Sequence, residues 1–168
     1  MIKHWFTSKK ANKERTAEVD ERLHSCSVLI VDDSRTQLFA MAKMLKSVGI
    51  TTHTAENGKQ GILMARHIKP DLILMDIVMP ELNGFQATRH LTRQPDTSHI
   101  PIIIVSGSNQ ESDKAWGLKL GARDYIAKPV NKTELIAKVY LWLNSDSVAA
   151  AKGSNNNNMN MLNTVQAI

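Results

Sequence analysis

The chain has 168 residues, 42% of them hydrophobic, and a formal net charge of +5, which suits one folded domain with flanking segments. Two of these charges come from residues 1–26, where six Lys and Arg oppose four Asp and Glu. No long basic stripe interleaved with aromatic residues appears, so we expect no nucleic-acid partner. The single cysteine, Cys26, excludes an internal disulfide framework and suits a reducing compartment. No apolar stretch approaches the roughly 20 residues of a membrane span, so we expect a cytoplasmic protein.

Composition divides the chain into three parts. Residues 1–25 form a charged N-terminal extension, which is either mobile or loosely docked, or else a contact segment anchored by Trp5 and Phe6. Residues 26–145 carry alternating strand and helix patterns. Residues 146–168 are rich in Asn and small residues, a composition typical of a disordered tail. We expect one folded domain between two extensions, with a tail too short to be an output domain.

Five strand patterns follow one another in the central part. They are SVLIV at 27–31, ITTHTA at 50–55, LILMD at 72–76, IPIIIVSG at 100–107 and RDYIA at 123–127. The third is a short apolar run between Pro70 and Pro80, and it fits an interior strand covered on both faces. The second is more polar, so we expect it near an edge of the sheet.

Amphipathic helix patterns separate these strands. The first follows a cap at Asp33 or Ser34 and places apolar residues on one face: Leu38, Met41, Leu45 and Val48. Later helices are expected to open at Asn57, near Phe85 and before Ala115, and the last one at a capping box formed by Asn131 and Glu134. This alternation predicts an α/β fold with a doubly wound, five-stranded parallel sheet and right-handed crossovers.

Polar side chains follow the ends of four predicted strands. The first strand leads into Asp32 and Asp33, and the others end at or near Asp76, Ser106 and Lys128. Parallel strands share one carboxyl edge, so we expect these residues to be neighbours. Crowded carboxylates repel one another, and Mg²⁺, which prefers oxygen ligands, relieves that repulsion. The cluster contains no His or Cys, which argues against zinc.

This arrangement resembles the receiver domain of two-component response regulators, the CheY-like family, from about Ser27 to Leu143. The signature is an acidic pair, an Asp with Met-Pro three residues on, a Ser or Thr, and Lys-Pro. The resemblance implies a flavodoxin-like (βα)5 fold with strand order 2-1-3-4-5. Two stretches, MDIVMPELNGFQATRHLTRQPDTSHIPIIIVSG and DKAWGLKLGARDYIAKPV, further resemble single-domain regulators of chemotaxis-like systems that control type IV pili and twitching motility.

The resemblance also implies roles for the site residues. Asp76 would be the phosphoacceptor, attacking the phosphohistidine of a histidine kinase. Asp33 and Asp76 would bind Mg²⁺, with Asp32 contributing directly or through water and Val78 through its backbone carbonyl. Lys128 would pair with one phosphoryl oxygen, and Ser106 would donate a hydrogen bond to another.

The same resemblance predicts a conformational switch and an output face. Tyr125 would be the switch aromatic, moving inward as Ser106 shifts toward the phosphoryl group. A downstream protein target would dock on the face formed by the domain's fourth helix, fifth strand and fifth helix, including Lys119 and Arg123. The Lys128–Pro129 bond is the natural candidate for a cis peptide.

The signalling role has two alternatives. The protein is expected not to be an enzyme, and to act by docking on a partner or by draining phosphoryl groups from a shared kinase. A phosphohydrolase with an aspartyl-phosphate intermediate is the first alternative, but Val78 stands where such enzymes usually carry a second carboxylate. The second is a receiver-like interaction scaffold that is never phosphorylated.

Overall fold

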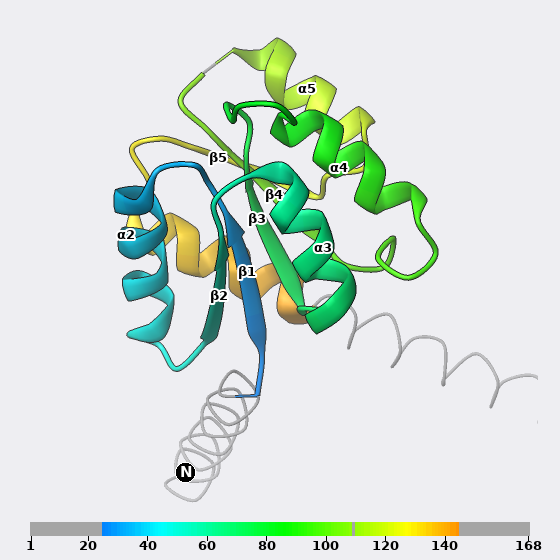
Figure 1. Ribbon diagram of the computed structural model, residues 1–168. Helices are drawn as coiled ribbons and strands as arrows, with labels where there is room; N and C mark the ends of the chain where they lie inside the picture. Colours follow the sequence, from blue (N-terminus) through cyan, green and yellow to red (C-terminus); the bar gives the residue numbers. More distant parts are fainter. Residues whose placement is uncertain (1–24, 109, 145–168) are drawn as a thin grey trace, which may run out of the picture.

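The computed structural model describes residues 25–108 and 110–144, so nearly all of the predicted N-terminal extension and the whole predicted tail lie outside the described residues. Five parallel strands form one sheet: β1 (Ser27–Val31), β2 (Thr51–Ala55), β3 (Leu72–Asp76), β4 (Ile102–Ser106) and β5 (Asp124–Ala127). Their order is β2-β1-β3-β4-β5 (Figure 1), which confirms the predicted topology. The polar β2 lies at an edge, as its composition predicts.

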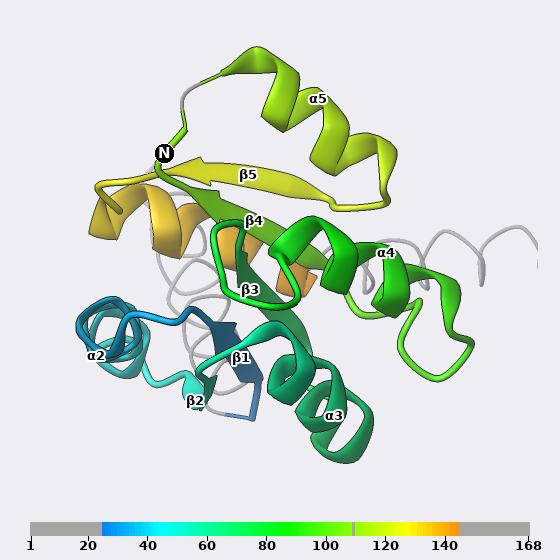
Figure 2. The same cartoon turned by 45° about the horizontal axis from the view of Figure 1, so that its top comes forward.

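Helices cover both faces of this sheet. They are α2 (Arg35–Lys46), α3 (Gly58–Ile68), α4 (Gly84–Arg93), α5 (Glu111–Lys119) and a C-terminal helix over residues 132–144. Figures 1 and 2 show α2 and the C-terminal helix on one face and α3, α4 and α5 on the other. This two-sided cover is the doubly wound arrangement that alternating strands and helices predict. No helix in the described part of the chain has the length and apolarity needed to cross a membrane.

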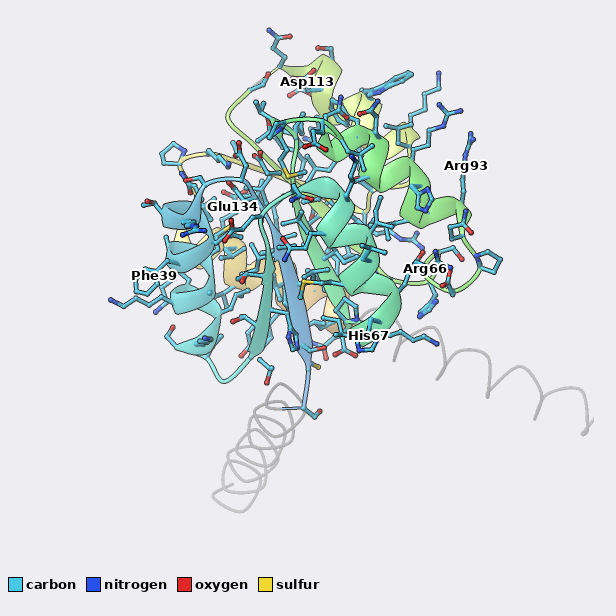
Figure 3. All side chains as sticks on the ribbon, in the orientation of Figure 1. Phe39, Arg66, His67, Arg93, Asp113 and Glu134 are labelled. Atoms are coloured by element: carbon cyan, nitrogen blue, oxygen red, sulfur yellow. The ribbon has the colours of Figure 1, made fainter. Side chains whose placement is uncertain are left out.

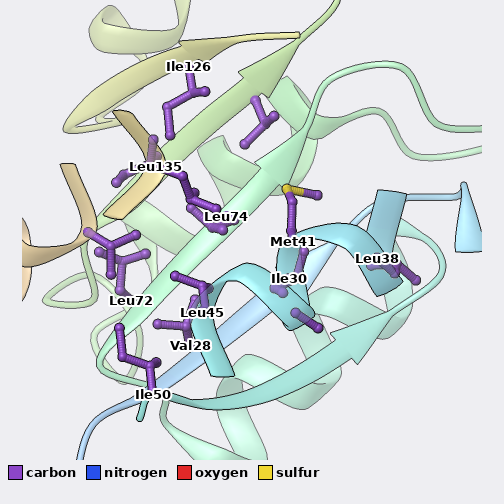
Figure 4. Packing of buried hydrophobic residues seen from close by; sticks show 14 residues of the cluster. Val28, Ile30, Leu38, Met41, Leu45, Ile50, Leu72, Leu74, Ile126 and Leu135 are labelled. Carbon is purple, nitrogen blue, oxygen red and sulfur yellow. The ribbon is translucent and has the colours of Figure 1, made fainter. Parts of the chain in front are cut away.

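Alternate strand residues build a core on each face. On one face, Val28, Ile30 and Leu74 pack against Leu45 of α2 and Leu135 of the C-terminal helix (Figure 4). On the other face the strand residues between them pack against α3 and α4; this core includes Leu29, Ile73, Met75, Ala65 and Leu91. All five residues of β3 are buried, which agrees with its expected place inside the sheet.

Side-chain caps fix where the helices begin. Ser34 caps α2, and Asn83 caps α4, where its backbone N–H also donates to the Gln86 side-chain oxygen; α4 begins one residue earlier than expected. Asn131 accepts a hydrogen bond from the backbone N–H of Glu134 at 3.2 Å. The predicted capping box at Asn131 is nevertheless wrong for the Glu134 side chain. Its carboxylate turns toward Lys138 Nζ, 3.8 Å away, and not back toward the Asn131 N–H.

Candidate functional site

The carboxyl edge of the sheet brings together residues from four strand ends. Asp32 follows β1, Asp76 ends β3, Ser106 ends β4, and Lys128 follows β5. In the sheet register Asp76 pairs with Val105, and Ser106 pairs with Ala127, the residue before Lys128. Asp32, Asp76 and Ser106 are buried, with exposed fractions of 0%, 4% and 1%. The sheet therefore positions polar groups at the edge where open α/β folds hold their ligands.

Lys128 joins two of the strand ends by ion pairs. Its Nζ donates to Asp32 Oδ2 at 2.8 Å and to Asp76 Oδ1 at 2.7 Å. Its own backbone N–H donates to the Ser106 carbonyl at 2.7 Å, and the Lys128–Pro129 peptide bond is cis. The two ion pairs and the backbone hydrogen bond together hold the Lys128 ammonium group against the buried carboxylates of Asp32 and Asp76.

The electrostatics of these groups differ. Burial raises the pKa of Asp76; the hydrogen bond from Lys128 opposes that rise, and the charges of Asp32 and Asp33 add to it. For Lys128, burial alone would lower the pKa, but the hydrogen bonds that its ammonium group donates to Asp32 and Asp76 raise it above its ordinary value. Lys128 is therefore a fixed positive charge at neutral pH, whereas Asp76 is a carboxylate with an incomplete set of partners.

Three carboxylates lie together at this edge. Ligand oxygens of Asp32, Asp33 and Asp76 all lie within 4.8 Å of one another. Three carboxylates beside one ammonium leave a net charge of about −2, which a divalent cation would balance. Each of the three residues offers only carboxylate oxygens, so the donor set suits Mg²⁺ rather than zinc.

Asp32 is already engaged at both of its oxygens. Oδ1 accepts from the backbone N–H of Ser34 at 2.8 Å, and Oδ2 accepts from Lys128. Asp33 is exposed and Asp76 uses one oxygen for Lys128, so these two residues retain oxygens that can face a cation directly. Asp32 is the residue best arranged to reach a cation through water.

A short hydrogen-bonded chain links Ser106 to Tyr125. The Ser108 backbone N–H donates to Ser106 Oγ at 3.1 Å, and the Tyr125 hydroxyl donates to the Ser108 carbonyl. Tyr125 is buried and packs with Ile104 and Ile77 beneath the loop after β4. Ser108 is therefore hydrogen-bonded to both the Ser106 hydroxyl and the Tyr125 hydroxyl.

Gly84 is a site residue that the sequence analysis missed. A Cβ built on it would lie 1.9 Å from the Asp76 carbonyl oxygen, and its N–H donates to the Ile77 carbonyl at 2.9 Å. The start of α4 therefore packs directly on the backbone that carries Asp76. Asn83-Gly84 was a turn signal in the sequence, but only the folded backbone shows what the glycine touches.

Val78, two residues after Asp76, exposes 74% of its surface.

Comparisons with known proteins agree with this geometry. Residues 28–140 match the response regulator receiver domain family. The chain is 53% identical to PilH of Pseudomonas aeruginosa over 112 residues, which cover 67% of this chain and 93% of PilH. It is 38% identical to the phosphate regulon regulator PhoB of the same organism, covering 67% of this chain but only 49% of PhoB.

Solved structures give the same result. The chemotaxis response regulator CheY4 of Vibrio cholerae superposes with a TM-score of 0.66 at 26% identity, covering 70% of this chain and 98% of CheY4. The receiver domain of the sensor histidine kinase PA1611 from Pseudomonas aeruginosa, solved with magnesium in its active-site cleft, gives a TM-score of 0.67 at 31% identity, covering 71% and 98%. The chain belongs to the response regulator receiver domain family.

Proposed function

We propose that the protein is a phosphoacceptor of two-component signalling, in which Asp76 receives a phosphoryl group from a histidine kinase in the cytoplasm. The observation that supports this most strongly is the placement of Asp76, a nearly buried carboxylate 2.7 Å from Lys128 and within 4.8 Å of two further carboxylates. Phosphoryl transfer depends mainly on the position of the nucleophile and on neutralisation of charge, and much less on an acid–base partner. The position of Asp76 and the charge of Lys128 beside it fit these requirements.

The transfer would leave one carboxylate oxygen of Asp76 to face the cation and use the other as nucleophile. That oxygen forms a bond to phosphorus while the phosphorus–nitrogen bond of the donor histidine breaks, and the leaving imidazole takes up a proton. Lys128 would move its ion pair from the carboxylate to a phosphoryl oxygen, and Ser106 would donate its hydroxyl to another. A bound Mg²⁺ would neutralise phosphoryl charge, held by Asp33, Asp76 and the Val78 carbonyl, with Asp32 acting through water.

The phosphoryl group would change the loop after β4. Ser106 Oγ accepts from Ser108 before transfer, so turning the hydroxyl toward a phosphoryl oxygen would release that bond and with it the loop that holds Tyr125. The expected output face is α5, β5 and the C-terminal helix, where Lys119 and Arg123 are exposed and Lys119 lies over Trp116 at 5.5 Å. Phosphorylation would shift a pre-existing equilibrium at this face.

The pathway proposal rests on similarity to PilH. At 53% identity over 93% of that protein, a role in a chemotaxis-like system controlling type IV pili and twitching motility is the preferred assignment. The protein would act there by docking on a target or by draining phosphoryl groups from a shared kinase. A phosphohydrolase is disfavoured because Val78, not a carboxylate, follows Asp76 at the position where leaving-group protonation would be needed.

The test is phosphorylation of the full-length protein by acetyl phosphate with Mg²⁺, followed by intact-mass spectrometry. We expect a gain of one phosphoryl group that disappears with EDTA and in Asp76→Asn. Steady-state release of phosphate from a simple phosphate ester would favour the hydrolase instead. Failure of both acetyl phosphate and a panel of histidine kinases to label the wild type would favour the unphosphorylated scaffold.

A further inference from the structure

The outer surface of α3 and α4 carries charge of one sign. Neither helix contains an Asp or Glu: their sequences are GKQGILMARHI and GFQATRHLTR. They contribute four cations, Lys59, Arg66, Arg89 and Arg93, all of them exposed. Figure 3 shows Arg66, His67 and Arg93 on the same side of the molecule.

Among the described residues, the cations of α3 have ion-pair partners and those of α4 have none. Lys59 pairs with Glu81 at 2.7 Å, and Arg66 pairs with Asp96 at 3.1 Å. Within residues 25–108 and 110–144, the side chains of Arg89 and Arg93 form neither an ion pair nor a hydrogen bond. The unbalanced positive charge of this surface therefore lies on α4.

These two arginines occupy one face of the helix. Arg89 and Arg93 are four residues apart, so their guanidinium groups stand on consecutive turns of the same face. They line a shallow hollow of about 310 Å³, whose other lining residues are Gln86, His90 and Gln94. We call these five residues the α4 basic surface.

The helix dipole explains only part of this surface. Cations in the last turn of a helix are stabilised by its negative end, which accounts for Arg93. Arg89 lies before that turn, and the dipole does not explain why both adjoining helices lack acidic residues. The surface is also distinct from the phosphoacceptor site, because α4 meets that site through its first residue, Gly84.

We propose that the α4 basic surface is a docking site for an acidic helical segment of a partner protein. Two guanidinium groups on consecutive turns match carboxylates spaced four residues apart on a facing helix, and each fork can bind a carboxylate through two parallel hydrogen bonds. The hollow has room for a few side chains. Two neighbouring arginines do not form the long basic stripe that a continuous phosphate backbone needs, so nucleic acid is disfavoured. This partner would differ from the phosphodonor.

The test uses a fluorescein-labelled peptide of roughly 16 residues, Ala-rich with Glu at every fourth position, titrated with the full-length protein at about 50 mM salt, where screening is weak. Fluorescence anisotropy measures the affinity. Replacing both arginines (R89Q with R93Q) should weaken binding about tenfold, the effect of losing two exposed ion pairs. The matched control, K43Q with K46Q, removes the same charge from exposed positions on α2 and should change affinity less than twofold.

Three results would overturn the proposal. Equal losses in the two double variants would mean that net charge alone attracts the peptide. Tighter binding of single-stranded DNA carrying the same charge would identify nucleic acid as the occupant. Peptide binding that strengthens severalfold when Glu14, Glu18, Asp20 and Glu21 are changed to amides would assign the surface to this chain's own N-terminal segment. Labelling by acetyl phosphate should be unchanged in R89Q with R93Q, which separates this proposal from the function of Asp76.

Discussion

Lys128 neutralises only part of the negative charge around it. Its ammonium group contacts Asp32 and Asp76, while Asp33 forms no ion pair with any residue that the structure describes. Burial keeps water from solvating the remaining negative charge at Asp76, and this raises the pKa of that carboxyl. Asp76 is therefore a residue whose charge destabilises the fold.

Replacing this charge should stabilise the protein. A carboxyl whose folded pKa is raised costs stability at every pH above that pKa, and the cost disappears below the unfolded value of about 3.9, where both states are protonated. In EDTA, Asp76→Asn should raise the free energy of unfolding by on the order of 1 kcal/mol at neutral pH. Urea titrations at several pH values measure this, and a variant less stable than wild type at neutral pH would contradict it.

Asp124 shows the opposite behaviour. Burial alone would raise its pKa, but hydrogen bonds from Lys138 Nζ, the Tyr125 N–H and Trp142 Nε1 lower it below the ordinary value. These bonds attach the start of β5 to the C-terminal helix. The stability they contribute is present above the unfolded pKa and is lost as pH falls through the lower, folded pKa.

We expect Asp124→Asn to lower the free energy of unfolding by about 1–3 kcal/mol at neutral pH, since bonds to a charged acceptor are lost. The loss should shrink in acid, as protonation removes the same charge from the wild type. Asp113→Asn is the control, because that carboxylate forms no ion pair within the described ranges. A pH-independent difference for Asp124→Asn would mean that packing, not charge, supplies the stability.

At the scale of elements, the contact between α4 and β3 sets the position of Asp76. The first residue of α4 lies against the carbonyl of the last residue of β3, and only a residue without a Cβ fits there. The capping box at Asn83 and Gln86 fixes the start of the helix at the same point. The helix therefore holds the backbone of Asp76 in place.

Gly84→Ala should break this contact. The added methyl carbon would meet the Asp76 carbonyl at 1.9 Å, so the strand end or the helix must move. We expect a loss of about 1–3 kcal/mol in stability and much slower labelling by acetyl phosphate. Gly107→Ala is a matched stability control, since nothing lies within 4 Å of its added Cβ. Equal stability of the two variants, measured by thermal denaturation, would show that the α4 contact is dispensable.

At the scale of the whole molecule, the parallel sheet separates the site from the chain ends. The acidic cluster occupies the carboxyl edge, whereas Cys26 and Trp142 line one cavity of about 350 Å³ with Lys69 and Pro101, residues that precede β3 and β4. Both ends of the described domain therefore lie at the edge opposite the acidic cluster.

Mg²⁺ should stabilise the whole fold through this edge. A cation that binds only the folded state raises the free energy of unfolding, by roughly 2.7 kcal/mol at a hundredfold excess over its dissociation constant. Asp33→Asn should abolish most of that gain while leaving stability in EDTA nearly unchanged, because Asp33 is exposed. Thermal shifts with and without Mg²⁺ measure both. An undiminished Mg²⁺ response in Asp33→Asn would show that Asp33 is not a ligand.

Much of this molecule follows from local sequence. Apolar runs predict the strands, the polarity of ITTHTA predicts an edge, and polar residues at strand ends predict a shared site because parallel strands point the same way. Caps at Ser34 and Asn57 are also local, since each bonds a backbone N–H three residues on. These properties depend on residues close together in the chain.

Tertiary structure alone decided the rest. Periodicity does not fix the order of strands, which was inferred from family resemblance, and it does not reveal that Lys128 pairs with residues 96 and 52 positions away. The contact of Gly84 with Asp76 and the turn of Glu134 toward Lys138 likewise depend on which backbones and side chains meet after folding. The sequence determined which groups reach the carboxyl edge; packing determined their distances, burial and charge balance, because these are properties of neighbours in space.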